Sequence, residues 1–176
     1  MSEVVLLGAG ADAGAPASFA LARIQSILRG RRIVTRTLLL HDAPASDALH
    51  PRTACESPES ARDFIATATG IVLFAAGIRT AISGALTAFL HEMPESHLRD
   101  TSILTVIVGG RRPDLAGAEI NAILARSGAN RLLPGIAVTD QQAHVAHGGG
   151  FVLDSAVEWR LRESLASLAA EPVRAA

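Results

Sequence analysis

Glycines gather in this sequence where an apolar run gives way to a helix-like stretch. Gly8, Gly10 and Gly14 follow the apolar residues 3–7. Glycine lets the backbone approach a ligand closely, and the N–H groups at the start of a helix bind phosphate. This loop holds no Arg and no Lys, and its one hydroxyl is that of Ser18 near its end. The pattern therefore predicts a phosphate cradle that works through backbone groups.

Two other interpretations of this loop stay open. The spacing G-x-G-x-x-x-G is one residue longer than a dinucleotide-binding fingerprint, with Asp42 placed to hold a ribose hydroxyl. The glycines also suit a tight strand-to-helix turn that binds nothing. Asp12 limits the phosphate interpretation, because two unit charges about 4 Å apart repel by roughly 4 kcal/mol at an effective dielectric near 20. Asp12 must therefore point away from any phosphate bound here.

The remaining reactive side chains do not form a recognisable catalytic or metal site. Asp140, His144 and His147 could supply metal ligands, but a third imidazole at a fixed spacing is missing. Their segment is better interpreted as a solvated loop. Cys55 has no His near it in the sequence, and Ser83 lacks a G-x-S-x-G context, which favours a helix N-cap. We expect no catalytic side chain and no metal ligand.

Composition narrows the class of protein. The chain has 176 residues, of which 49% are hydrophobic, which suits a single domain over residues 1–176. Its net charge of −1 argues against nucleic-acid and anionic-membrane partners. All 16 basic residues are Arg, which excludes lysine nucleophiles and Schiff bases. The longest apolar run, residues 71–78, is too short to cross a bilayer. We therefore expect a soluble, cytoplasmic protein.

Hydrophobic periodicity predicts five strands that alternate with five helices. The predicted strands are residues 3–7, 32–40, 70–76, 102–110 and 131–138. The predicted helices are residues 16–29, 58–67, 83–93, 114–126 and 153–169. Such alternation indicates a doubly wound α/β fold, here a flavodoxin-like three-layer sandwich with a five-stranded parallel sheet in the order 2-1-3-4-5. Ligands of this fold bind beyond the carboxyl ends of the strands, so the loops 8–17, 76–82 and 109–113 should form the site.

The middle of the chain resembles a known family. The stretch "ATGIVLFAAGIRTAISGALTAFLHEMP", followed by "ILTVIVGG", is similar to NADPH-dependent FMN reductases, nearest the branch that supplies alkanesulfonate monooxygenases. The "SGAL" at 83–86, Pro94 and the "GG" at 109–110 keep the spacing of that branch. The likeness is more diffuse toward the two ends of the chain.

The resemblance implies an FMN site on the three predicted loops. The first loop and its helix would hold the phosphate, and the loops after strands three and four would flank the flavin ring. NADPH or NADH would supply the hydride, and the cofactors carry that chemistry without a side-chain nucleophile. The implied cofactor-binding residues are Gly8, Gly10, Ala11, Ser18, Ala76, Gly77, Ile78, Arg79, Gly109, Gly110 and Arg111.

The sequence departs from the family pattern at the first two loops. Ala9 and Ala11 stand where the family has Ser and Arg. Ala76, Gly77 and Ile78 replace a Pro-x-Tyr beside the flavin ring, and Arg79 follows with a planar group that could take the aromatic place. A non-catalytic flavodoxin-like scaffold with a degenerate FMN site is therefore the alternative to a reductase.

The resemblance also implies assembly. The helix 83–93 is apolar beyond what one face of a helix needs, and Leu86, Phe89 and Met93 follow helical spacing. We expect this ridge to join a homodimer or homotetramer. A flavin-dependent monooxygenase is the expected protein partner.

Overall fold

The computed structural model describes residues 3–9, 16–40, 58–76, 84–145 and 151–170. A parallel sheet in the order β2-β1-β3-β4-β5 forms its centre, and β6 also pairs with β4. The predicted strand order is therefore confirmed. The strands of this sheet are β1 (Glu3–Ala9), β2 (Val34–Leu40), β3 (Gly70–Ala76), β4 (Ser102–Val108), β5 (Arg131–Leu132) and β6 (Ile136–Val138).

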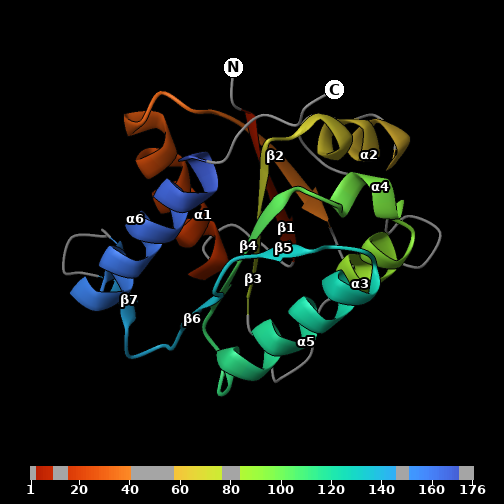
Figure 1. The fold of residues 1–176 in the computed structure, drawn as a ribbon. Helices are drawn as coiled ribbons and strands as arrows, with labels where there is room; N and C mark the ends of the chain where they lie inside the picture. Colours follow the sequence, from red (N-terminus) through yellow and green to blue (C-terminus); the bar gives the residue numbers. More distant parts are fainter. Residues whose placement is uncertain (1–2, 10–15, 41–57, 77–83, 146–150, 171–176) are drawn as a thin grey trace.

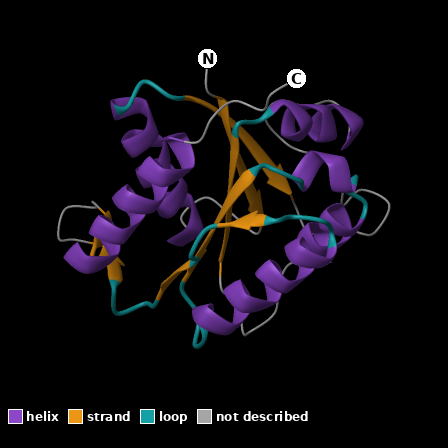
Figure 2. Cartoon of the chain, viewed as in Figure 1, coloured by secondary structure: helices purple, strands orange, loops and turns teal. Residues whose placement is uncertain are grey.

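Helices cover both faces of the sheet and make three layers (Figures 1 and 2). They are α1 (Pro16–Gly30), α2 (Pro58–Thr67), α3 (Gly84–His91), α4 (Glu95–Leu98), α5 (Pro113–Arg126) and α6 (Ser155–Ala170). Helices α1 and α6 lie on one face, and α2, α3, α4 and α5 lie on the other. The described helices include none that is long and apolar enough to span a membrane.

The alternation of side chains along buried strands separates two hydrophobic clusters. Val4 and Leu6 face α1 and α6, whereas Val5 and Leu7 face the other four helices. Every residue of β4 is buried, as expected for a central parallel strand covered on both faces. This packing fixes the carboxyl ends of the strands, where the predicted loops begin.

The last predicted strand, residues 131–138, is two short strands instead of one. Pro134 has no N–H to donate to a ladder, and the pairing with β4 is interrupted between β5 and β6. The segment that we interpreted as a solvated loop also differs, because β7 (Ala143–Val145) pairs antiparallel with β8 (Phe151–Leu153). Helix α4 likewise was not predicted.

The prediction that the apolar ridge of residues 83–93 forms a subunit interface is wrong. Leu86, Phe89 and Met93 are buried within the chain's own core, and Phe89 is only 1% exposed. The strongly apolar character of α3 comes from packing against the sheet and its neighbouring helices. These three side chains are therefore not available to a second subunit.

Candidate functional site

Three strands end together at the edge where the fold places ligands. In the parallel register Ala9 lies opposite Ala75, and Ala76 lies opposite Val108. The chain order reverses between β1 and β3, so this edge contains the topological switch point. The three loops predicted to form the site therefore begin side by side.

Six of the predicted site residues fall within the described residues. They are Gly8, Ser18, Ala76, Gly109, Gly110 and Arg111. Gly10, Ala11, Gly77, Ile78 and Arg79 lie outside the described residues.

Gly8 is explained by packing. A Cβ added to Gly8 would lie 2.2 Å from Cζ of Phe74 on the adjacent strand β3. Phe74 is fully buried, so its ring cannot move aside cheaply. The ring of Phe74 therefore requires glycine at this position whether or not a ligand is bound.

The Gly109–Gly110 pair is explained by backbone conformation. Its φ angles are 80° and 81°, in the left-handed region that side chains disfavour. The Gly109 N–H donates a hydrogen bond to the carbonyl oxygen of Val138 at 2.7 Å, which fixes the turn to the end of β6. The pair thus forms a turn without side chains at the ligand edge.

Helix α5 begins directly after this turn and brings positive charge to the edge. Pro113 occupies the first turn, and Arg112 at the N-cap makes no side-chain capping bond. Arg112 instead donates two hydrogen bonds to Asp114, at 3.1 and 2.9 Å. These bonds hold the pKa of Asp114 below its ordinary value, and the same carboxylate raises the pKa of Arg112. Arg111 is exposed beside this pair, so the edge keeps a cationic side chain next to the turn.

Two further predicted residues, Ser18 and Ala76, lie in the elements that reach this edge. Ser18 lies in the first turn of α1 and is half-buried. Ala76 ends β3, is half-buried, and packs against the cluster formed with α1 and α6. Both residues are small, and the N-terminus of a helix carries a partial positive charge that favours an anion.

The metal candidates do not come together in the described chain. His144 lies in β7 and Asp140 lies in the turn before it, whereas His147 falls outside the described residues. Among the residues that the structure describes, no three His, Cys, Asp or Glu side chains form a group that could hold a metal ion.

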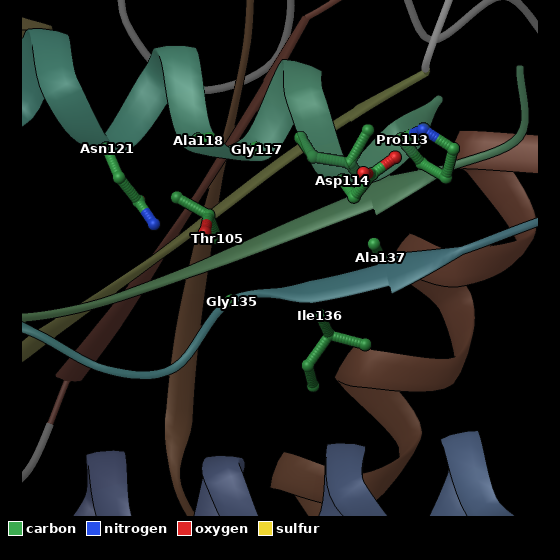
Figure 3. A pocket seen from close by; sticks show the side chains of 10 residues that line it. Thr105, Pro113, Asp114, Gly117, Ala118, Asn121, Gly135, Ile136 and Ala137 are labelled. Carbon is green, nitrogen blue, oxygen red and sulfur yellow. The ribbon is translucent and has the colours of Figure 1, made fainter. Parts of the chain in front are cut away.

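Sequence reasoning missed one feature, a cavity beside β4. It lies under α5 and is bordered by Thr105, Asn121 and Gly135 (Figure 3). One feature of the sequence is related to this cavity, because Pro134 and Gly135 interrupt an otherwise strand-like run beside it. Nothing in the sequence indicates that Thr105 and Asn121 meet there.

Fold and edge together define a flavodoxin-like α/β protein, and comparison with known proteins agrees. No family model matches the chain. It is similar to a curated FMN reductase (NADPH) of Pseudomonas putida, with 27% identity over 165 residues, which cover 92% of this chain and 84% of the relative. The resemblance to FMN reductases drawn from the sequence is therefore confirmed.

Solved structures share the fold over nearly the whole chain. The apo form of the NADH:FMN oxidoreductase EmoB has a TM-score of 0.72 at 18% identity, covering 98% of this chain and 92% of its own. The flavoenzyme FerB, an NAD(P)H:(acceptor) oxidoreductase from Paracoccus denitrificans, has a TM-score of 0.68 at 14% identity and covers 96% of both chains. A flavodoxin-like domain from Synechococcus has a TM-score of 0.57 at 17% identity, covering 94% of this chain and 95% of its own.

Proposed function

We propose that this protein is an NAD(P)H-dependent FMN reductase, an oxidoreductase that transfers hydride from a nicotinamide to flavin. The observation that carries the proposal is the shared edge of β1, β3 and β4, where the loops of a flavin site begin side by side. The similarity to the FMN reductase (NADPH) of Pseudomonas putida supports the same activity. NADPH and NADH are both retained as donors.

The residues at this edge suit FMN. The Gly109–Gly110 turn has no side chains that would fill the space of a flat ring. The positive φ angles of both residues favour glycine at these positions. The start of α1, with Ser18 in its first turn, offers donors for a phosphate. We assign the remaining contacts to Gly10, Ala11, Ala76, Gly77, Ile78, Arg79 and Arg111, whereas Gly8 is assigned to packing against Phe74.

In the reaction, the protein binds FMN and the nicotinamide nucleotide and orients them. Bound FMN would supply the hydride-accepting and hydride-donating chemistry. The N-terminus of α1 would hold the phosphate of FMN, and the Gly109–Gly110 turn would lie beside its ring. Arg111 places a positive charge at the edge, which favours anionic nucleotides through Coulomb attraction. No side-chain nucleophile takes part in this assignment.

The test is a titration of the purified protein with FMN, followed by flavin absorbance and fluorescence. We expect saturable binding and NADPH oxidation that depends on FMN. A colourless protein that leaves FMN fluorescence unchanged would overturn the proposal and favour a non-catalytic scaffold.

Assembly and location belong to the same proposal. We propose a cytoplasmic homodimer or homotetramer that delivers reduced flavin to a monooxygenase. Since the apolar ridge of α3 is buried, a contact through this helix would use its exposed positions Gly84, Ala88 and His91. Light scattering of the wild type and of Ala88→Glu tests this, with a lower mass expected for the variant. A wild-type monomer would contradict the assembly while leaving the reductase proposal intact.

A further inference from the structure

The break between β5 and β6 is a bulge that opens the side of the sheet. Ile103 pairs with Leu132 and Val106 pairs with Ile136, so two residues of β4 face three residues, 133–135, on the other strand. The Leu133 N–H still donates to the Ile103 carbonyl oxygen at 2.9 Å. Beyond it the chain bends at Pro134, and Gly135 comes close to β4 without a side chain.

A cavity of about 260 Å³ lies where this bulge faces α5 (Figure 3). Its lining is mostly apolar and comes from β4, α5, β6 and the segment just before β6. The lining residues are Thr105, Ile107, Pro113, Asp114, Gly117, Ala118, Asn121, Gly135, Ile136 and Ala137. Asp114, Ala118 and Gly135 are exposed, so the cavity opens to solvent between α5 and β6.

Two polar atoms in this cavity lack partners. Oγ1 of Thr105 and Oδ1 of Asn121 are buried and have no hydrogen-bond partner among the described residues. Thr105 is only 1% exposed and points from β4 toward α5, while Asn121 points from α5 toward the sheet. Buried polar groups are nearly always hydrogen-bonded, because an unmade bond is costly. This pair therefore indicates an occupant.

The two polar groups border one spot in the cavity. A Cβ added to Gly135 would lie 2.7 Å from Oγ1 of Thr105 and 3.6 Å from Nδ2 of Asn121. Both side chains therefore lie close to Gly135, and a head group in the cavity beside this glycine can approach them because no Cβ fills the space. Oδ1 of Asn121 needs a donor, whereas the Thr105 hydroxyl can donate or accept.

We propose that this cavity binds a small neutral molecule whose apolar ring carries a group that both donates and accepts hydrogen bonds, such as a phenol or a primary aromatic amide. The size fits, because a cavity of about 150 Å³ holds benzene. Anions are disfavoured, because the lining that the structure describes is mostly apolar and contains no cationic residue to replace the lost hydration of an anion. Recognition would place the ligand's donor on Oδ1 of Asn121 and its acceptor against the hydroxyl of Thr105.

Water is the competing occupant, since the cavity has room for several molecules at about 30 Å³ each. A titration followed by amide ¹H–¹⁵N NMR distinguishes the two. Phenol and benzamide should shift the signals of Thr105, Asn121 and Gly135 saturably, with dissociation constants of about a millimolar. Toluene should bind at least tenfold more weakly than phenol, and benzoate should not bind. Absence of saturable shifts with phenol and benzamide would leave water as the occupant and overturn the proposal.

Two variants separate recognition from folding. Thr105→Val keeps the shape and removes a hydroxyl without a partner, so the melting temperature should stay equal or rise. It should weaken phenol binding at least tenfold while toluene binds as well as before. Gly135→Ala places a methyl group in the shared spot and should abolish binding of both probes.

The matched control is Gly30→Ala, whose added Cβ meets nothing within 4 Å. It should bind phenol as the wild type does. Unchanged phenol affinity in folded Thr105→Val would overturn the proposal, because the hydroxyl would then have no part in recognition.

Discussion

Two glycine-bearing strand ends at the ligand edge look alike in sequence and differ in physical cause. At Gly8 the constraint is the Phe74 ring, 2.2 Å from where a Cβ would stand. At Gly109 and Gly110 the constraint is the backbone, with φ angles of 80° and 81°. Gly8 is required by packing in the core, whereas the Gly109–Gly110 pair forms part of the surface that a ligand would contact.

This difference teaches how far a glycine pattern can be trusted as a sign of a site. Gly8 would be required in a protein of this packing that bound nothing, so it carries little information about flavin. The Gly109–Gly110 turn is set by its positive φ angles and lies next to Arg111 at the switch-point edge. The case for a ligand therefore rests more on the end of β4 than on the end of β1.

The largest expected effect is on stability at the β1 end. Gly8→Ala should lower the free energy of unfolding by about 3 kcal/mol, because an overpacked core must shift side chains or backbone. Phe74→Leu in the same chain should restore part of the loss, since the smaller side chain makes room for the new methyl group. Urea denaturation of the two single variants and the double variant measures this coupling.

The same double variant tests whether Gly8 contributes to FMN binding. If Gly8 serves packing alone, the folded Gly8→Ala/Phe74→Leu protein should bind FMN within about threefold of the wild type, a difference of roughly 0.6 kcal/mol. A tenfold loss in a fully folded double variant would show instead that Gly8 contacts the cofactor.

A smaller effect is expected from restoring the side-chain donor that the first loop lacks. Ala11→Arg combined with Asp12→Asn removes one negative charge and adds a charge-assisted donor for the FMN phosphate. FMN binding should tighten by about 2 kcal/mol, the scale of a hydrogen bond to a charged group. Fluorescence titration measures it, and Asp12→Asn alone is the control for charge. Unchanged affinity in the double variant would place the phosphate elsewhere.

At the β4 end the expected cost of a side chain is smaller. Gly109→Ala should destabilise by about 1 kcal/mol, the scale of a left-handed conformation in an L-residue. Gly109→Asn should cost less, because Asn adopts this conformation more readily than Ala. Thermal denaturation ranks the two, and an equal cost for both would argue for a steric cause at this turn as well.

The centre of the sheet could be predicted because β1, β3 and β4 are buried on both faces and form continuous apolar runs in the sequence. The break at Pro134 and the hairpin β7–β8 could not, since segments of two or three residues carry too little periodicity. The ridge of α3 was misread for a related reason. An apolar helix surface has the same pattern whether its own sheet or a second subunit covers it, and Phe89 turned out to face the core.

The candidate edge could be predicted from topology alone, because parallel strands end together at one side. The roles of single residues could not. The reason for Gly8 is Phe74, 66 positions away in the sequence, and Thr105 meets Asn121 only through the register of β4 under α5. Such contacts depend on tertiary packing that no local pattern contains.

The smallest expected effect concerns the charges that frame the Gly109–Gly110 turn. Hydrogen bonds from Arg112 are the main cause that lowers the pKa of Asp114 below its ordinary 3.8. The stabilisation that this carboxylate contributes is therefore fully present above pH 3.8 and is lost as the pH falls through the lowered pKa. Arg112→Gln should raise the Asp114 pKa toward its ordinary value, as measured by carboxyl ¹³C NMR titration. The pKa of Asp114 should not return completely to its ordinary value, because the backbone N–H groups of Asp114 and Leu115 also lower it.

Arg111→Gln is the matched control, since Arg111 is not among the causes that lower the pKa of Asp114. An equal rise in both variants would show that general positive charge at the edge sets the pKa, and would remove the distinct role of the Arg112–Asp114 pair.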